Sequence, residues 1–441
     1  MTTALILGSG MVATPLVDYL IDTCRYRVVL TDFSAEGAAR IIRGRPLGVP
    51  TAWTARDTAL LQRLVRDADV VVSMLPPALH PQVAQTCLAH RRHLVTTSYI
   101  SDAMAALDGE ARARNLIFLN EVGESPGLDH MSALALLDDA RREGEEILEL
   151  RSYAGGLPAF RWNTNPWGYK FSWSPRGVFK AVQAPAVYLE RGRRIIVASQ
   201  ELFTHPRLAD IQKVGVFETY PNRDATRYLE PYGLEPHVSL YRGLLRHRGW
   251  CAMMRAIGAL GLLDDSEIHR FDRMTHASFL STLLGCDEGD LQSALARRLG
   301  IGPYDPIIER LEWLGLCGST SPRRAEGTAL DIFLDLAVAK LAYGPGEQDM
   351  VVVHNEVVSR SEDKTTRRHT ATLMAEGVPN GDSAMARAVG LTAGIATKLV
   401  VEGAVKARGV LGPFSSELYG PVLDEMATRG FRFAVHRSSL P

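Results

Sequence analysis

The amino-acid sequence predicts an α/β fold with more than one domain. Up to about residue 120, short apolar strands alternate with helices, and a glycine-rich turn follows the first strand. After Leu148 the pattern changes to a strand-rich region and then to a helical one. The chain of 441 residues is also long for a single hydrophobic core, so we expect two or three domains.

The overall composition, with 46% hydrophobic and 22% charged residues, is that of a soluble globular protein. A formal net charge of −1 gives no reason to expect nucleic acid or a membrane as partner. The five cysteines are scattered without a CxxC motif, which favours a reducing compartment and argues against a structural metal site. The sequence shows no cleavable leader and no run of about 18 apolar residues, so we expect a cytoplasmic protein.

The first strand, Ala4–Leu7, leads into the stretch GSGMVATPLVDYL. Gly8, Gly10 and Ala13 have the spacing of a dinucleotide-binding turn: the first allows the tight turn, the second admits a pyrophosphate, and the third keeps the helix close. This spacing alone is weak, but the flanking strand and helix agree with it. The residues expected to contact the cofactor here are Gly8, Ser9, Gly10, Met11 and Val12.

The second strand, RVVLTD, ends at Asp32, followed by Phe33. An acid at this place accepts hydrogen bonds from the adenosine ribose diol, although it also suits a cap for a helix over 34–40. Because its charge repels a 2′-phosphate, we predict NAD as the cofactor. NADP stays possible, since Arg40 and Arg43 lie downstream.

The alternation continues with strands DVVVSML, HLVTTSY and LIFLN, separated by helical segments. Near-continuous apolar strands indicate a parallel, doubly wound sheet, whose ligands lie at the carboxyl ends of the strands. Two further groups of cofactor contacts are therefore expected at Leu75–Pro76 and Thr97–Ser98. The third strand end opens into NEVGESPGLDH, residues 120–130.

Three titratable residues near these strand ends have competing interpretations. His80 is a candidate proton donor, but its place before Pro81 favours a capping or solvent-facing role. Asp129 and His130 form a candidate catalytic pair. They also begin a helix, where an acid in the first turn interacts with the helix dipole.

The second half of the chain changes character. Strands are expected in ILELRSYAGGL, RRIIVAS and KVGVFETY, followed by a helical stretch over about 239–345. DMVVVHNEVVSRS and TRRHTATLMAEG then form an antiparallel pair. A helix rich in Gly and Ala, in SAMARAVGLTAGIATKLVVEGAV, implies close packing, and FRFAVH is the closing strand.

Eight ordered motifs carry a resemblance that covers nearly the whole chain. They are LGSGMVATPLVDYL, LPPALHPQVA, TTSYIS, NEVGESPGLDH, SYAGGLPA, NPWGYKFSWSPRG, YPNRDAT and RGLLR, and GIATKLVVEGAVKARGVLGP follows them. The chain resembles saccharopine dehydrogenase of the glutamate-forming type. The resemblance implies reversible hydride transfer between a nicotinamide and the carbon of a secondary amine that joins two amino-acid units.

The resemblance also implies a domain organisation and a homodimer. A Rossmann dinucleotide-binding domain is expected from residues 1–124 and 390–441. An inserted α/β domain is expected from 125–238 and 346–389, and a small helical domain from 239–345. The substrate implied is a small amino-acid-derived molecule.

Arg223, in YPNRDAT, is the expected carboxylate-binding residue, because guanidinium binds carboxylate through two hydrogen bonds. Asp224 is available to orient it; the alternative is an arginine in a surface loop. Thr226 of the same motif is placed with the substrate-binding residues. Tyr99 is expected to contact substrate or donate a proton, and Tyr169, Phe171 and Trp173 to form an apolar wall, or else a core or an interface.

The chain departs from the family at the substrate site. Glu124 and Ser125 stand where the family has Leu-Asp, Ala154 where it has cysteine, and Phe160–Arg161 where it has Pro and Glu. Ser125, grouped with Tyr99 as a catalytic position, lacks the charge of the aspartate, and Glu124 is positioned to replace it. We therefore expect an altered substrate pocket with the hydride chemistry retained.

Two other functions stay open. One is a polyamine-type enzyme such as carboxynorspermidine dehydrogenase or homospermidine synthase, for which the lost Asp and Cys leave room. The other is a nucleotide-binding scaffold without catalysis. The glycines of the turn, Asp32, Tyr99 and Arg223 argue against that scaffold.

Overall fold

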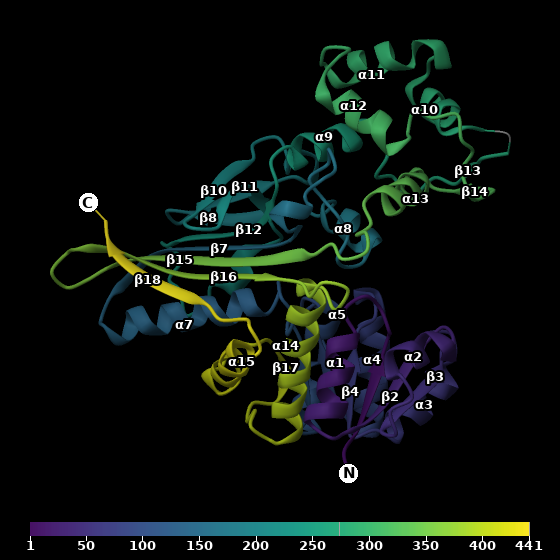
Figure 1. The fold of residues 1–441 in the computed structure, drawn as a ribbon. Helices are drawn as coiled ribbons and strands as arrows, with labels where there is room; N and C mark the ends of the chain where they lie inside the picture. Colours follow the sequence, from purple (N-terminus) through teal and green to yellow (C-terminus); the bar gives the residue numbers. More distant parts are fainter. Residues whose placement is uncertain (273, 441) are drawn as a thin grey trace.

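The computed structural model describes residues 1–272 and 274–440, and it confirms the predicted α/β fold (Figure 1). The first of its two large sheets is parallel, in the order β17-β6-β5-β4-β1-β2-β3. Its strands are β1 (Thr3–Leu7), β2 (Arg27–Asp32), β3 (Gly48–Ala52), β4 (Val70–Ser73), β5 (His93–Thr96), β6 (Ile117–Leu119) and β17 (Gly409–Leu411). Six strands come from the first 120 residues, and β17 joins them from near the C-terminus.

Helices cover both faces of this sheet. They are α1 (Thr14–Asp18, continued by a π-helical turn, Tyr19–Thr23), α2 (Ala35–Ile42), α3 (Thr58–Arg66), α4 (His80–His90), α5 (Asp102–Ala105), α6 (Asp108–Ala113), α14 (Ala384–Val401) and α15 (Ser416–Thr428). A Cβ atom on Gly390 of α14 would lie 2.8 Å from the Leu16 nitrogen of α1. The small residues of α14 therefore permit the predicted close packing. Among the described residues only α14 is long and apolar enough to cross a membrane, and 78% of it is buried inside the protein.

Strand β3 was not predicted from the sequence. Its sequence, GVPTA, contains Pro50, which lacks the N–H that a strand paired on both sides would donate. The strand pairs only with β2, at the edge of the sheet, where this loss is tolerated.

The second sheet has nine strands and mixed direction, with the path β10-β11-β12-β7-β15-β16-β18. Its strands are β7 (Glu146–Pro158), β8 (Ala186–Glu190), β9 (Arg193–Val197), β10 (Arg207–Ile211), β11 (Gly215–Pro221), β12 (Ser239–Arg246), β15 (Asp349–Arg360), β16 (Thr366–Glu376) and β18 (Ala434–Ser439). The long antiparallel pair β15–β16 is the one predicted. Helix α7 (Leu128–Arg142) packs on β7, β15 and β16.

Two sequence assignments require correction here. The helical prediction over 239–345 was wrong at its start, because β12 lies in the middle of the second sheet, between β11 and β7. Six of its eight residues are buried, so it shows no polar alternation. The closing strand β18 pairs with β16 in the second sheet, although 390–441 was assigned to the dinucleotide-binding domain.

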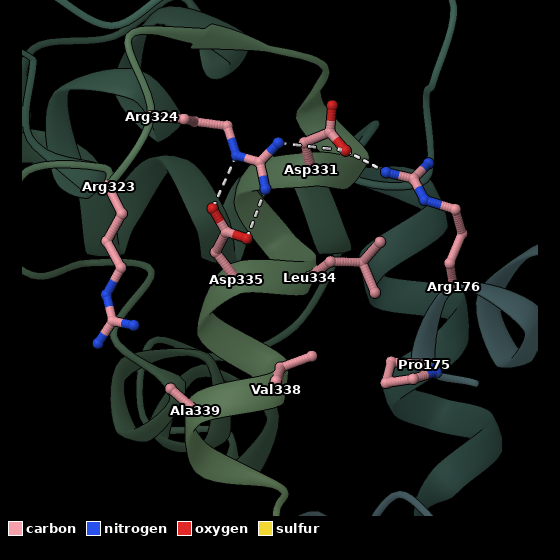
Figure 2. A pocket seen from close by; sticks show the side chains of 9 residues that line it. All are labelled: Pro175, Arg176, Arg323, Arg324, Asp331, Leu334, Asp335, Val338 and Ala339. Carbon is pink, nitrogen blue, oxygen red and sulfur yellow. Dashed lines mark hydrogen bonds and ion pairs between the residues drawn. The ribbon is translucent and has the colours of Figure 1, made fainter. Parts of the chain in front are cut away.

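The remaining chain is mainly helical, and its residues 276–314 extend away from the two sheets (Figure 1). It contains α8 (Pro175–Ala181), α9 (Trp250–Ala259), α10 (His276–Leu284), α11 (Leu291–Leu299), α12 (Pro306–Leu314), α13 (Ala329–Lys340) and the short pair β13 (His269–Arg270) and β14 (Glu326–Gly327). A groove of about 550 Å³ lies between α8 and α13, bordered by the ion pairs Arg176–Asp331 and Arg324–Asp335 (Figure 2). No predicted site residue lines this groove.

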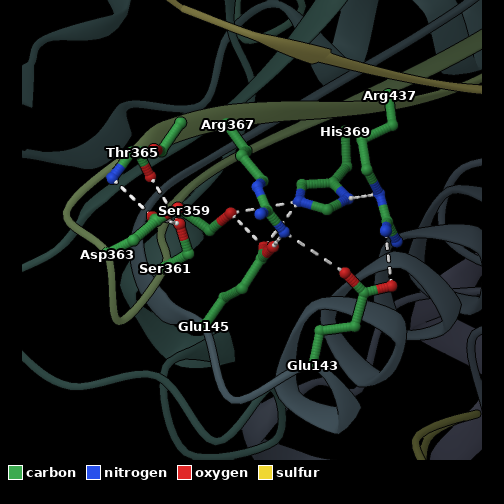
Figure 3. A network of polar contacts seen from close by, with 9 residues as sticks. All are labelled: Glu143, Glu145, Ser359, Ser361, Asp363, Thr365, Arg367, His369 and Arg437. Atoms are coloured by element: carbon green, nitrogen blue, oxygen red, sulfur yellow. Dashed lines mark hydrogen bonds and ion pairs between the residues drawn. The ribbon is translucent and has the colours of Figure 1, made fainter.

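A buried polar network holds β18 at the end of the second sheet (Figure 3). The Glu145 carboxylate, fully buried, accepts hydrogen bonds from Ser359 Oγ (2.5 Å), His369 Nε2 (2.7 Å) and an Arg367 guanidinium nitrogen (2.7 Å). Arg437 of β18 donates from Nε to His369 Nδ1 at 3.2 Å. The network therefore links the turn between α7 and β7 with β15, β16 and β18.

Replacing Glu145 with Gln is expected to lower the free energy of unfolding by about 1–3 kcal/mol, because the hydrogen bonds from Ser359 and His369 are weakened at a buried position and Arg367 loses a counter-charge. Although burial opposes it, hydrogen bonds from Ser359, Arg367 and His369 lower the pKa of Glu145. This stabilisation is therefore present above the unfolded pKa of the carboxyl and is lost as pH falls through the lower folded value. Urea denaturation measures both effects. The control Glu146→Gln, at an exposed ion pair with Arg360, should change stability by less than about 1 kcal/mol.

Candidate functional site

The turn after β1 has the geometry of a dinucleotide-binding turn. Gly8 has φ +104°, and a Cβ there would lie 3.2 Å from the Met74 carbonyl oxygen. A Cβ on Gly10 would meet no atom within 4 Å, so the backbone is open to a ligand. Ala13 is fully buried, whereas Met11 is exposed and Val12 half-buried. These residues fit the pyrophosphate of a dinucleotide.

Asp32 lies at the carboxyl end of β2, beside this turn. Its carboxylate accepts hydrogen bonds from Ser9 Oγ and from the Phe33 amide (2.6 Å). Helix α2 is capped by Ser34 and not by Asp32, since Ser34 Oγ accepts from the Gly37 amide at 3.1 Å. The Phe33 side chain is exposed. The helix-cap interpretation of Asp32 is therefore wrong, and its carboxylate is held beside the glycine-rich turn by Ser9.

His80 joins the ends of β4 and β5. Its Nδ1 lies 2.9 Å from Ser73 Oγ, and its Nε2 lies 2.8 Å from Ser98 Oγ and 3.0 Å from Thr96 Oγ1. Burial lowers the pKa of His80 to about 4, so the ring is neutral near pH 7. The ring thus positions Ser98 at the cofactor side of the sheet. Its solvent-facing interpretation was wrong.

The other predicted cofactor contacts lie at neighbouring strand ends. Leu75 and Pro76 follow β4, and Thr97 and Ser98 follow β5, which pairs with β4. Leu75, Thr97 and Ser98 are half-buried and Pro76 is exposed. These residues share the sheet edge at which β1 and β2 end.

The loop NEVGESPGLDH connects the first sheet to α7. Gly127 has φ +149°, and a Cβ on it would lie 2.0 Å from the Gly123 carbonyl oxygen, so only glycine fits. The Gly123 amide donates to the Pro126 carbonyl at 2.9 Å. This tight turn places Glu124, Ser125 and Asp129 together.

Asp129 is at the centre of a buried ion pair. Its carboxylate lies 2.5 Å from the Arg242 guanidinium, with both side chains 2% exposed, and it accepts a hydrogen bond from Ser125 Oγ at 2.9 Å. Although burial favours the neutral acid, the charges of His130 and Arg242 and the hydrogen bonds lower its pKa to about 2. Asp129 is therefore more than a first-turn acid: it compensates the buried charge of Arg242.

His130 faces away from this ion pair. Its Nε2 lies 3.2 Å from the Glu121 carboxylate and its Nδ1 2.5 Å from Tyr232 Oη. Asp129 and His130 thus have separate partners and do not form the catalytic pair that the sequence raised.

Arg246, four residues along β12 from Arg242, has a different environment. Its guanidinium carbon lies 5.4 Å from the ring centres of Tyr169 and Trp250 and 5.9 Å from that of Tyr220. No carboxylate of the described residues lies within ion-pair distance, and Arg246 Nε has no hydrogen-bond partner. The Tyr169 and Tyr220 hydroxyls and Trp250 Nε1 are likewise buried without partners. This cluster presents a buried, uncompensated cation and several free polar groups, as a carboxylate-binding site does.

Tyr99 lies between two arginines. Its ring centre is 5.7 Å from the Arg242 guanidinium carbon and 5.9 Å from that of Arg223, and its hydroxyl accepts from Asn222 Nδ2 at 3.1 Å. Burial raises the pKa of Tyr99, so its hydroxyl is neutral near pH 7. The structure thus brings Tyr99 and Arg223 together.

Asp224 does not orient Arg223, contrary to the expectation. The Asp224 carboxylate accepts from the Thr226 amide (2.9 Å) and hydroxyl (2.5 Å), and Arg194 lies 3.9 Å away. Asp224 therefore caps a short 3-10 helix by accepting both hydrogen bonds from Thr226. Arg223 instead is half-buried, has φ +58°, and leaves its Nε without a partner.

The remaining predicted residues surround this region. Ala154 is buried on β7 between β12 and β15. Phe171 packs edge-on against Tyr169, with ring centres 5.5 Å apart, so it supports Tyr169 from the core. Trp173 is half-buried between two hydrophobic clusters.

Sequence reasoning missed Arg242 and Arg246 as site residues and undervalued Asp129. The motif RGLLR was recognised, but the surrounding segment was assigned to a helix. Two arginines within an otherwise apolar segment were the available signal, because buried arginines require a partner.

Comparison with known proteins gives matches over the whole chain. Residues 4–119 match the saccharopine dehydrogenase NADP binding domain, and residues 123–431 match the saccharopine dehydrogenase C-terminal domain. Saccharopine dehydrogenase [NADP(+), L-glutamate-forming] of Schizosaccharomyces pombe is 31% identical over 98% of both chains. Mitochondrial alpha-aminoadipic semialdehyde synthase of Bos taurus is 34% identical over 97% of this chain, which spans 47% of the length of that protein.

A solved structure agrees with the fold. The apo saccharopine dehydrogenase (L-Glu forming) from Saccharomyces cerevisiae superposes with a TM-score of 0.87 at 30% identity, covering 99% of this chain and 100% of that one.

Proposed function

Because this chain belongs to the saccharopine dehydrogenase family, we propose that it is an NAD(P)-dependent oxidoreductase acting on the CH–NH bond of a saccharopine-like secondary amine. The observation that carries the proposal is Arg246, a buried guanidinium without a counter-charge among the described residues. Such a charge is costly to bury unless a ligand supplies the anion. The amino-acid units of the substrate bring carboxylates for this purpose.

Each residue of the cluster has a part in this reaction. Arg246 and Arg223 hold substrate carboxylates, and Asp129 keeps Arg242 compensated so that it does not compete for them. The neutral Tyr99 hydroxyl is available as a hydrogen-bond donor beside Arg223. Fixed positioning of this kind lowers the barrier by holding the reacting carbon in place.

The dinucleotide fits the turn at Gly8–Gly10 and the carboxylate of Asp32. A bound nicotinamide would exchange a hydride with the substrate carbon. In the oxidative direction the amine loses a hydride from carbon and a proton from nitrogen, which gives an imine. Water then splits the imine into an aldehyde and an amine.

NAD is the cofactor that Asp32 favours. Its carboxylate would face a 2′-phosphate, and Arg43 is already paired with Asp18 at 2.5 Å. Arg40 is exposed on α2. The proposal of NAD thus rests on the negative charge of Asp32, which would repel the 2′-phosphate of NADP. The relatives include proteins named for NADP, so this residue is the one to test.

The function is tested by oxidising L-saccharopine with NAD or NADP and following absorbance of the reduced cofactor. We expect turnover, with kcat/KM for NAD about 100-fold above that for NADP. Asp32→Ala should reduce this preference, whereas Asp57→Ala at the start of α3 should not. No turnover with either cofactor would contradict the activity; a preference for NADP in the unmodified enzyme would contradict only the assignment of NAD.

A further inference from the structure

Glu124 is a buried acid without a hydrogen-bond partner at one oxygen. Its side chain is 6% exposed, and Oε1 is buried and unpaired among the described residues. It lies close enough to Arg246 and Arg242 of β12 for their charges to act on it, as does the charge of Asp129 on α7. Arg242 is already paired with Asp129, whereas neither Glu124 nor Arg246 has an ion-pair partner among the described residues.

Glu124 and Arg246 do not form an ion pair with each other, because no carboxylate oxygen of Glu124 lies within 4 Å of a guanidinium nitrogen of Arg246. Two opposite buried groups that merely stabilised the fold would be expected to pair, because isolation is costly for each. A ligand that carries both charges would satisfy both groups at once. The amino-acid end of a molecule has a carboxylate for Arg246 and an ammonium for Glu124.

We propose that Glu124 determines substrate specificity by receiving a primary ammonium group of the substrate while Arg246 receives the adjacent carboxylate. This inference rests on the proposed function and narrows its substrate class. The substrate is a secondary amine of two amino-acid units, one of which retains a free ammonium. A secondary amine that carries carboxylates but no primary ammonium is a poor substrate.

Binding of such a substrate changes the ionisation of Glu124. Burial and the charge of Asp129 raise its pKa to about 8, against the opposing effect of Arg246 and Arg242, so the acid is mainly neutral at pH 7. An ammonium beside it favours the carboxylate. Binding of the ammonium is therefore accompanied by release of a proton to the solvent.

The experiment compares L-saccharopine with the analogue in which its primary ammonium is replaced by hydrogen. Glu124→Gln should lower kcat/KM for saccharopine by about 10- to 100-fold, with little change for the analogue. Calorimetry at pH 7 in buffers of different ionisation enthalpy should show release of about one proton when saccharopine binds the unmodified protein with NADH, and none for the variant. Glu110→Gln, at an exposed ion pair of α6, serves as the matched control, with both quantities unchanged.

The outcomes separate the two claims. Equal losses on both substrates, or unchanged proton release in Glu124→Gln, would overturn this inference while the enzymatic function stands. If the unmodified protein neither binds nor oxidises saccharopine or its analogue, the proposed function fails and this inference fails with it. Thermal unfolding of Glu124→Gln identifies a purely structural role, for which both substrates would lose activity together.

Discussion

Replacing Arg246 with methionine is expected to lower kcat/KM for saccharopine by about 100- to 1,000-fold, because a substrate carboxylate loses its buried cationic partner. The thermal midpoint should stay the same or rise. In the described residues no acid is paired with Arg246, so the substitution removes an uncompensated charge and leaves none behind. Affinity for NADH should not change, since the dinucleotide-binding turn belongs to the other sheet.

Two comparisons make this result specific. Arg246→Lys keeps the charge but loses the planar group that lies among Tyr169, Tyr220 and Trp250, so partial activity is expected. Arg255→Met, at an exposed position of α9, should have normal kinetics and is the control. Normal kcat/KM in Arg246→Met would remove Arg246 from the substrate site.

Replacing Asp129 with asparagine, unlike the Arg246 substitution, is expected to destabilise the fold. The free energy of unfolding should fall by about 3–5 kcal/mol. The change leaves the Arg242 guanidinium buried without a counter-charge. Chemical denaturation measures the loss. The additional change Arg242→Met should restore part of it, because it removes the stranded charge.

The contribution of Asp129 also depends on pH. Its pKa of about 2 in the folded protein is lower than the ordinary value of an aspartate. The stabilisation is therefore complete above the unfolded pKa and is lost as pH falls toward about 2. Asp139→Asn, on the exposed side of α7, is the control and should cost less than about 1 kcal/mol. A similar loss in both variants would show that the ion pair contributes nothing particular.

The elements that could be predicted are those whose residue spacing or apolar pattern lies within one short segment of the chain. The strand, glycine turn and helix at Ala4–Leu20 repeat a spacing that backbone geometry demands, and the structure shows them with Gly8 at positive φ. The antiparallel pair β15–β16 also follows from its pattern. β12 was not predictable in this way, because a strand buried on both faces shows no alternation.

The chemistry of the site depends on contacts that no local pattern encodes. Asp129 and Arg242 are 113 positions apart, and they meet only because α7 packs beside the second sheet. The sequence identified Glu124 and Ser125 as site residues because they depart from the family. It did not predict the hydrogen bond that Ser125 Oγ donates to Asp129. The expectation for Asp224 failed for a local reason: its carboxylate accepts hydrogen bonds from Thr226, two residues on, although Arg223 is its neighbour in the chain.

The two late strands, β17 and β18, have a consequence for synthesis on the ribosome. β17 completes the first sheet beside β6, which emerged about 290 residues earlier, and β18 adds to the second sheet beside β16. During translation the edge of β6 and the face of α1 that packs against α14 stay uncovered until residues 384–411 have been made. An exposed strand edge is prone to pair with other chains, so the nascent protein is most open to such pairing before these residues are made.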